Sequence, residues 1–311
     1  MLSWLKTLWV PGAILVLLVG ISAAVPPRTS TKSLQVRLDA STVAFGVYDP
    51  NGSLSQVPGI SIQHVFIDWN GPLGEKLRSV SNRAEQLGRD ILLTVEPWAR
   101  PGHTDAASYF KAIMSGQYDS SISELCDGVA KLRGSVLVRW GQEMDAPNDR
   151  YPWGGLDPSE YIQAYRHFVD SCRPHAPRAQ FVWSPRGDAG EEAYYPGDQY
   201  VDFVGLTLFG LEPWEDANYG HARSFAEALT EKYQPIERFG KRLILAEFGV
   251  CGQESYREAW ISSALEQGSK QFPLLVAVVY FNDLEPNQWP NTASRNSPEC
   301  EADSPDWRIQ F

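Results

Sequence analysis

Two glutamates of this sequence follow apolar runs of the chain. The run Val136–Trp140 is apolar apart from Arg139 and leads to Glu143, and the run Arg242–Ala246 leads directly to Glu247. Such runs are typical of strands that are buried on both faces of a parallel sheet. Two carboxyl groups delivered by two strands could act together as an acid and a nucleophile, or as an acid and a base.

The chemistry that needs such a pair is the cleavage of a glycosidic bond. One carboxyl group must protonate the leaving oxygen, while an ionised carboxylate attacks the anomeric carbon or activates water. We predict Glu143 as the acid/base and Glu247 as the nucleophile. A single glutamate after a strand is more often a salt-bridge or capping residue, so the prediction depends on the two occurring together.

Two polar residues near Glu143 could assist it. Arg139 precedes Glu143 by an even number of residues, so in an extended chain both side chains point to the same side. Arg139 could then keep Glu247 ionised by pairing with it, or it could form an ion pair of the scaffold. Gln142 could donate a hydrogen bond to a sugar hydroxyl or to the nucleophile.

Aromatic and acidic residues follow most of the apolar runs. Flat aromatic faces could stack on pyranose rings, and packing in the core is the alternative for each of them. The aromatic candidates are Trp69, Trp98, Trp140, Trp153, Trp183, Phe209, Tyr280 and Phe281. Asp68 and Glu96 could bind sugar hydroxyls or form scaffold ion pairs, and a scaffold role is the preferred interpretation of Asp49.

The elements that must position these residues alternate between strand and helix patterns, as in parallel α/β proteins. Strands are predicted at 43–48, 64–68, 90–95, 135–140, 180–184, 200–208, 242–247 and 274–281. Helices are predicted around 77–87, over 122–132 with Gly134 at the end, after Asp157, over 224–238 and over 256–268. Eight such units predict a single (β/α)8 barrel over residues 42–311, with its site at the C-terminal ends of the strands.

The first 24 residues are predicted to be an export signal. Lys6 precedes the apolar run Leu8–Val19, and Ser22–Ala24 offers small residues for cleavage. An uncleaved anchor is the alternative, although the run is short for a membrane span of about 20 residues. Residues 25–41 are predicted to be a linker. Whether the signal is cleaved or remains as an anchor, the barrel would be secreted or periplasmic. Only an uncleaved N-terminal segment would contact the membrane.

The four cysteines fit an exported protein. They form no CxxC motif and no cysteine–histidine metal spacing, and four cysteines allow three disulfide pairings. Cys126 and Cys172 fall on consecutive predicted helices, which are neighbours in a barrel, so the preferred pairing is Cys126–Cys172 with Cys251–Cys300. Four free thiols are the alternative.

Composition and charge exclude several classes of protein. A hydrophobic fraction of 43% and an aromatic fraction of 12% exclude global disorder. The net charge of -11 does not suit nucleic acid, whereas a neutral polysaccharide would suit it. The sequence has no glycine-rich phosphate loop and no Gly-x-Ser-x-Gly motif. We therefore expect no metal and no cofactor, and we expect a monomer.

Several motifs together resemble glycoside hydrolase family 26, which belongs to a clan of (β/α)8 retaining hydrolases. The matching segments are Glu96–Trp98, Arg139–Asp145, Phe181–Pro185, Tyr195–Gly205 and Leu243–Gly249. The resemblance implies the acid/base role for Glu143 and the nucleophile role for Glu247. It also implies an endo-acting β-glycanase that works with retention.

Two positions depart from the pattern of the family's mannanases. Gln142 stands where they usually have histidine, and Phe209 stands where family members often have tyrosine. The family also includes enzymes for mixed-linkage β-glucan and β-1,3-xylan, so Gln142 favours glucan over mannan. The alternative to an enzyme is a catalytically weak barrel that binds a polysaccharide, such as a bacterial exopolysaccharide, and assists its production or export.

Overall fold

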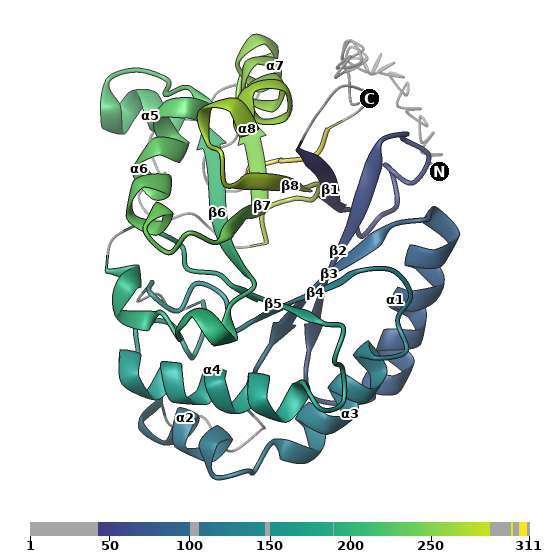
Figure 1. Ribbon diagram of the computed structural model, residues 1–311. Helices are drawn as coiled ribbons and strands as arrows, with labels where there is room; N and C mark the ends of the chain where they lie inside the picture. The colour runs from purple at the N-terminus through teal and green to yellow at the C-terminus, as the bar shows by residue number, and fades with distance from the viewer. Residues whose placement is uncertain are drawn as a thin grey trace, which may run out of the picture. The chain divides into compact units, whose positions relative to one another are not determined.

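The computed structural model describes residues 43–99, 106–146, 150–188, 190–286, 300 and 305–309, so the predicted signal and linker lie outside the described residues. Eight parallel strands close into a barrel in sequence order (Figure 1). The strands are β1 Ala44–Tyr48, β2 Ile60–Asp68, β3 Asp90–Glu96, β4 Val136–Trp140, β5 Gln180–Trp183, β6 Phe203–Leu211, β7 Arg242–Cys251 and β8 Leu275–Phe281. The predicted (β/α)8 fold is confirmed.

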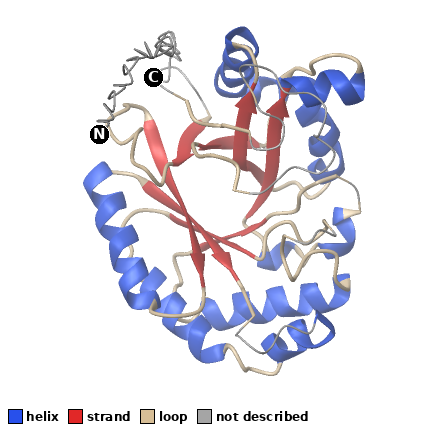
Figure 2. Ribbon diagram, turned by 180° about the vertical axis from the view of Figure 1, so that it is seen from behind, coloured by secondary structure: helices blue, strands red, loops and turns tan. Residues whose placement is uncertain are grey.

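The helices lie outside the ring of strands (Figure 2). They are α1 Leu73–Leu87, α2 Ala106–Met114, α3 Asp119–Val129, α4 Pro158–Cys172, α5 Glu212–Tyr219, α6 Phe225–Glu237, α7 Glu254–Ser262 and α8 Gly268–Gln271. Two short 3-10 helices, η1 Glu191–Tyr194 and η2 Asp198–Tyr200, precede β6, and the π-helical turn η3 Ser263–Gln267 joins α7 to α8. None of the described helices is long and apolar enough to cross a membrane.

The strands divide their side chains between two cores, because successive residues of a strand point to opposite faces. One set fills the inside of the barrel and consists of Ile62, Leu92, Leu137, Val182, Phe203, Ile244, Ala246, Ala277 and Val279. The other set packs against the helices. Two residues further along β2, β3 and β4, the inward positions are polar and carry His64, Thr94 and Arg139. The apolar floor of the barrel therefore supports a polar layer closer to the C-terminal ends.

A β-bulge in β7 turns Glu247 into the barrel. Ala246 already faces the inside, so strict alternation would point Glu247 toward the helices. The register with β6 shifts here, because Leu206 pairs with Leu245 whereas Thr207 pairs with Glu247. The extra residue on β7 places Ala246 and Glu247 on the same side.

Several element boundaries differ from the sequence predictions. β2 begins at Ile60, β6 runs three residues past its predicted end and β7 continues to Cys251, while α5 was not predicted. The helix predicted over 122–132 ends at Val129, and Gly134 is not its cap. Gly134 has a φ of +76° in the turn before β4, where a Cβ would meet a carboxylate oxygen of Asp90 at 2.9 Å. The turn into β4, rather than the end of the helix, needs this glycine.

Both preferred disulfides are confirmed. Cys126–Cys172 joins α3 to α4, and Cys251–Cys300 joins the end of β7 to the C-terminal segment. Buried Trp307 packs in the same cluster as the second disulfide, so this segment is held against the ends of β7 and β8.

Candidate active site

A buried ion pair joins β4 to β7 inside the barrel. Arg139 is fully buried, and its Nη1 donates to Oε1 of Glu247 at 2.6 Å. Its Nε donates to Oγ of Ser184 at 2.8 Å, and Nη1 also approaches Oγ1 of Thr94 at 3.4 Å. The guanidinium is thus fixed by residues of β3 and β7 and by the residue that follows β5. The predicted contact between Arg139 and Glu247 is present.

His64 extends this polar layer to β2. Its Nε2 lies 2.7 Å from Oγ1 of Thr94. Burial lowers the pKa of His64 well below its usual value, and the charge of Arg139 acts in the same direction. The imidazole is therefore neutral, and Arg139 supplies the positive charge beneath Glu247.

Opposing influences act on the pKa of Glu247. Burial raises it, the guanidinium of Arg139 lowers it, the charge of Glu143 raises it and Arg150 lowers it. The net direction is upward from the ordinary glutamate value. Glu247 thus gains a proton at a higher pH than an exposed glutamate would.

Glu143 has an unusual backbone conformation. Its φ is +55°, and among the described residues it is the only one other than glycine with a positive φ. β4 ends at Trp140 and the chain turns at Gly141, which has a φ of +56°. The assumption of an extended chain from Arg139 to Glu143 was therefore wrong, although both side chains reach the same site. Strain of about 1–3 kcal/mol at such a residue is typical of functional sites.

Neighbouring strands hold Glu143 in this conformation. Its backbone N–H donates to the carbonyl oxygen of Ser184 at 2.8 Å. Its Oε1 accepts a hydrogen bond of 2.8 Å from the hydroxyl of Thr207 on β6. Asp145 adds a further anchor, since its carboxylate accepts the backbone N–H groups of Arg186 and Gly187.

Gln142 contacts Glu96 of β3. Its Nε2 donates to Oε1 of Glu96 at 3.2 Å, and Oε2 of the same carboxylate accepts from the indole of Trp98 at 3.0 Å. The backbone oxygen of Gln142 accepts from the indole of Trp153 at 2.7 Å. Glu96 therefore orients Gln142 and Trp98, and Trp98 is half-buried.

Five of the eight aromatic candidates for stacking on sugars are fully buried, so the predicted role is wrong for them. Trp153, Trp183 and Tyr280 are fully buried, as are Trp69 and Trp140. Most of them occupy outward positions of the strands, next to inward residues, and therefore pack beneath the helices. Trp153 instead stacks on Tyr151 in the loop after β4, with ring centroids 4.7 Å apart. None of these rings has a face open to a sugar.

Inward positions supply a different aromatic group, formed by Tyr48, Phe66, Phe209 and Phe281. Tyr48 stacks on Phe281 at 4.9 Å and meets the edge of Phe66 at 5.0 Å, and Phe209 lies 6.0 Å from Phe281. Tyr48, Phe66 and Phe209 are half-buried. Phe209 was predicted, whereas Tyr48 and Phe66 were missed. Counting two residues onward from inward Ile62 and His64 would have found Phe66.

The predicted acidic residues at the first two strands have local partners. Asp49 accepts hydrogen bonds from the backbone of Ser53 and Leu54 and from the amide of Asn282, so it has the preferred scaffold role. Asp68 accepts two hydrogen bonds from Asn70 within a turn.

Arg150 is a site residue that sequence reasoning missed. It belongs to the loop after β4 and forms an ion pair of 3.5 Å with Glu285, while its side chain remains one-third exposed at 33%. Its charge interacts with both Glu143 and Glu247. The only signal in the sequence was a cation within an aromatic segment of that loop.

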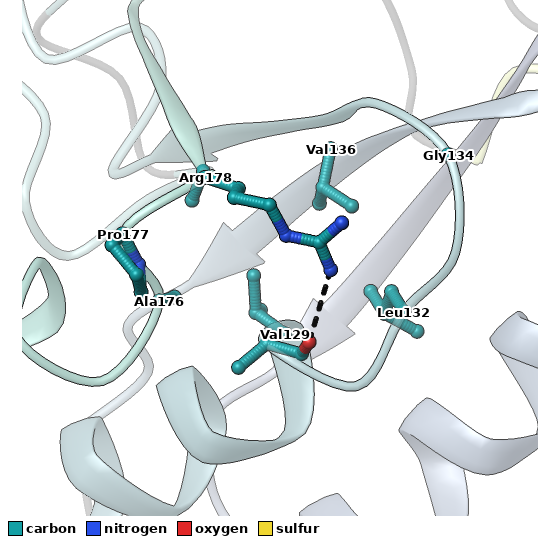
Figure 3. Close-up of a pocket in the computed structure, with 9 residues that line it drawn as sticks. Val129, Leu132, Gly134, Val136, Ala176, Pro177 and Arg178 are labelled. Carbon is teal, nitrogen blue, oxygen red and sulfur yellow. Dashed lines mark hydrogen bonds between the residues drawn. The ribbon is translucent and has the colours of Figure 1, made fainter.

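A cavity of about 210 Å³ lies at the opposite end of the strands (Figure 3). It is lined by Val136, the first residue of β4, and by Val129, Leu132 and Arg178. Arg178 donates to the carbonyl oxygen of Ala130 at 3.4 Å. Because Glu143 follows the other end of β4, this cavity is separate from the candidate active site. Among the described residues, no group of three or more His, Cys, Asp or Glu side chains could hold a metal ion.

Comparison with known proteins supports the family resemblance. The model of glycosyl hydrolase family 26 matches residues 110–230, which include Glu143 and Thr207 but not Glu247. Endoglucanase H of Acetivibrio thermocellus is 25% identical over 254 residues, which are 78% of this chain and 26% of that protein. The β-1,3-xylanase TXYA of a Vibrio species is 26% identical over 131 residues, which are 40% of this chain and 27% of that protein.

The resemblance to glycoside hydrolase family 26 is confirmed. A family 26 β-mannanase from Bacteroides ovatus has the same fold, with a TM-score of 0.56 and 17% identity over 78% of this chain and 81% of that chain. The chain spans about a quarter of the length of the first two curated relatives.

The strain at Glu143 predicts that a glycine variant is more stable than an alanine variant at this position, the reverse of the usual order in a helix. Because alanine is strained at a φ of +55° and glycine is not, Glu143→Gly should be more stable than Glu143→Ala by about 1 kcal/mol in urea unfolding. The same pair at Gln86, which is exposed in α1, serves as the control and should give the opposite order. Greater stability of the alanine variant at both positions would show that residue 143 is unstrained.

Proposed function

We propose that this chain is a retaining endo-β-glycanase, with Glu143 as the acid/base and Glu247 as the nucleophile. The observation that carries the proposal is the unequal environment of two buried carboxylates at the same end of the barrel. Glu247 is paired with a guanidinium, whereas Glu143 accepts a hydrogen bond from a neutral hydroxyl. Different environments let two carboxyl groups take different protonation states, as a glycosidase requires.

The reaction proceeds in two steps. Ionised Glu247 attacks the anomeric carbon as the glycosidic C–O bond breaks, and Glu143 transfers its proton to the leaving oxygen. Water then attacks the anomeric carbon of the glycosyl–enzyme ester, Glu143 takes a proton from this water, and Glu247 leaves as a carboxylate. Arg139 stabilises Glu247 before and after the two displacements.

The half-buried aromatic residues supply faces for sugar rings. We assign Tyr48, Phe66 and Phe209 to a stacking surface near Glu247, and Trp98 to one on the side of Glu96. Burial raises the pKa of Tyr48, and the charges of Asp283, Glu96 and Glu247 act in the same direction, so this ring lies within the field of the acidic residues of the site. Glu96 is half-buried and suited to hydrogen bonds with sugar hydroxyls, whereas Gln142 is fully buried and reaches the site through its hydrogen bond to Glu96.

A β-linked glucan is the preferred substrate. Gln142 in place of the histidine of the mannanases supports this preference, and one relative is named an endoglucanase. Other relatives are named β-1,3-xylanases and a mannan endo-1,4-β-mannosidase, so xylan and mannan belong in any test. Two disulfides support export to an oxidising compartment, with residues 1–24 as the proposed signal.

The direct test is release of reducing sugar from mixed-linkage glucan, cellulose, β-1,3-xylan, mannan and the host's exopolysaccharide. The wild type should cleave one of these polymers, and Glu143→Gln should lose about two to four decades of activity because proton transfer is lost. Glu247→Ala should be inactive. Arg178→Ala, at the opposite end of the barrel, is the control and should retain activity. Polymer binding without cleavage by the wild type would favour the alternative of a polysaccharide-binding barrel.

Arg150 should set the acid limb of the pH profile. Activity requires ionised Glu247 and is lost as the pH falls through its pKa. Since Arg150 opposes the rise of that pKa, Arg150→Met should move the acid limb of kcat/KM upward by about half a unit to one unit. Arg150→Lys keeps the charge and should leave the limb in place. An equal displacement in both variants would contradict an electrostatic role.

A further inference from the structure

We infer that Thr207 is a positioning residue for the acid/base, and that its hydroxyl selects the oxygen of Glu143 that carries the transferred proton. The inference rests on the proposed function and adds a residue to it. Thr207 lies on β6, four residues after inward Phe203 and two after Gly205, and it therefore faces the inside of the barrel.

The contact between the two side chains is short and shielded from water. Oγ1 of Thr207 donates to Oε1 of Glu143 at 2.8 Å. Thr207 is 9% exposed and Glu143 is 5% exposed, so water competes little for this hydrogen bond.

Both ends of the contact are attached to fixed backbone. Thr207 pairs in register with Glu247 across β6 and β7, and Glu143 is tied to Ser184 through its backbone N–H. Threonine is β-branched and has few χ1 rotamers, so its hydroxyl has a defined direction. Thr207 therefore contacts the acid/base through its side chain, and its backbone is the neighbour of the nucleophile in the sheet.

The hydrogen bond distinguishes the two oxygens of Glu143. A hydroxyl has a single hydrogen, and Thr207 directs it at Oε1. An oxygen that already accepts a hydrogen bond is the less favourable place for a proton, so the proton of the acid form resides on Oε2. It passes from Oε2 to the leaving oxygen, and the electron pair of the O–H bond stays on Glu143. The same hydroxyl then stabilises the carboxylate that remains.

The test compares leaving groups with and without a need for protonation. The variant is Thr207→Val, with Thr207→Ser as the control that restores the hydroxyl. The substrates are phenyl and 2,4-dinitrophenyl β-cellobioside, or the β-mannobioside pair if the wild type cleaves mannan. Thr207→Val should lower kcat/KM for the phenyl glycoside about 10- to 100-fold, the effect of losing a hydrogen bond to a charged group. The dinitrophenyl glycoside needs no acid and should change less than about threefold.

A second measurement repeats Thr207→Val in Glu143→Gln, where the valine should have little additional effect because Thr207 acts through Glu143. Equal losses on both glycosides, no loss on either, or an undiminished effect in Glu143→Gln would each overturn the inference. If the wild type cleaves the glycosides but Thr207→Val does not have the expected effects, the proposed function stands and the role of Thr207 is wrong. A wild type inactive on every glycoside and polymer overturns both.

Discussion

The ion pair between Arg139 and Glu247 is the interaction on which the rest of the site depends. Both groups are almost entirely removed from water, with side-chain exposures of 0% and 6%. A buried charge without its partner costs stability, so each residue of this pair stabilises the other inside the barrel. Ser184 accepts a hydrogen bond from Nε of the guanidinium, and Thr94 lies 3.4 Å from its Nη1. The strands that carry these residues must therefore close in register, and the bulge in β7 is what directs Glu247 at Arg139.

The barrel separates two kinds of side chain that are adjacent in sequence. Inward positions near the C-terminal ends are polar or half-buried aromatic, and outward positions next to them are large and apolar. Gly205 allows this arrangement on β6, because a Cβ there would meet Oγ of Ser184 at 2.7 Å. The tryptophans beneath the helices pack against the strands, whereas Tyr48, Phe66 and Phe209 at inward positions are only half-buried.

Much of the fold could be predicted from the sequence, and so could the placement of Glu143 and Glu247 at the same end of the barrel. Apolar runs and their alternation with helices predicted the barrel, and the disulfide pairing followed from helices that are neighbours in it. The positive φ of Glu143 and the bulge before Glu247 could not be predicted, because both arise from contacts with other strands. The alternation of inward and outward residues along a strand, if applied residue by residue, would have placed Trp183 and Tyr280 beneath the helices and excluded them as sugar-binding residues. Thr207 carried no local signal, since its role depends on a partner 64 residues away.

The most direct measurement is to identify the residue that forms a covalent bond with the sugar. A 2-deoxy-2-fluoro glycoside with a dinitrophenyl leaving group, of the sugar configuration that the enzyme cleaves, slows hydrolysis of the intermediate and allows it to accumulate. Mass spectrometry of the digested protein should find the fluoro-sugar on the peptide that contains Glu247, and Glu247→Ala should carry no label. A label on another residue, or turnover of the natural polymer with inversion and without any adduct, would contradict the assignment of Glu247 as the nucleophile.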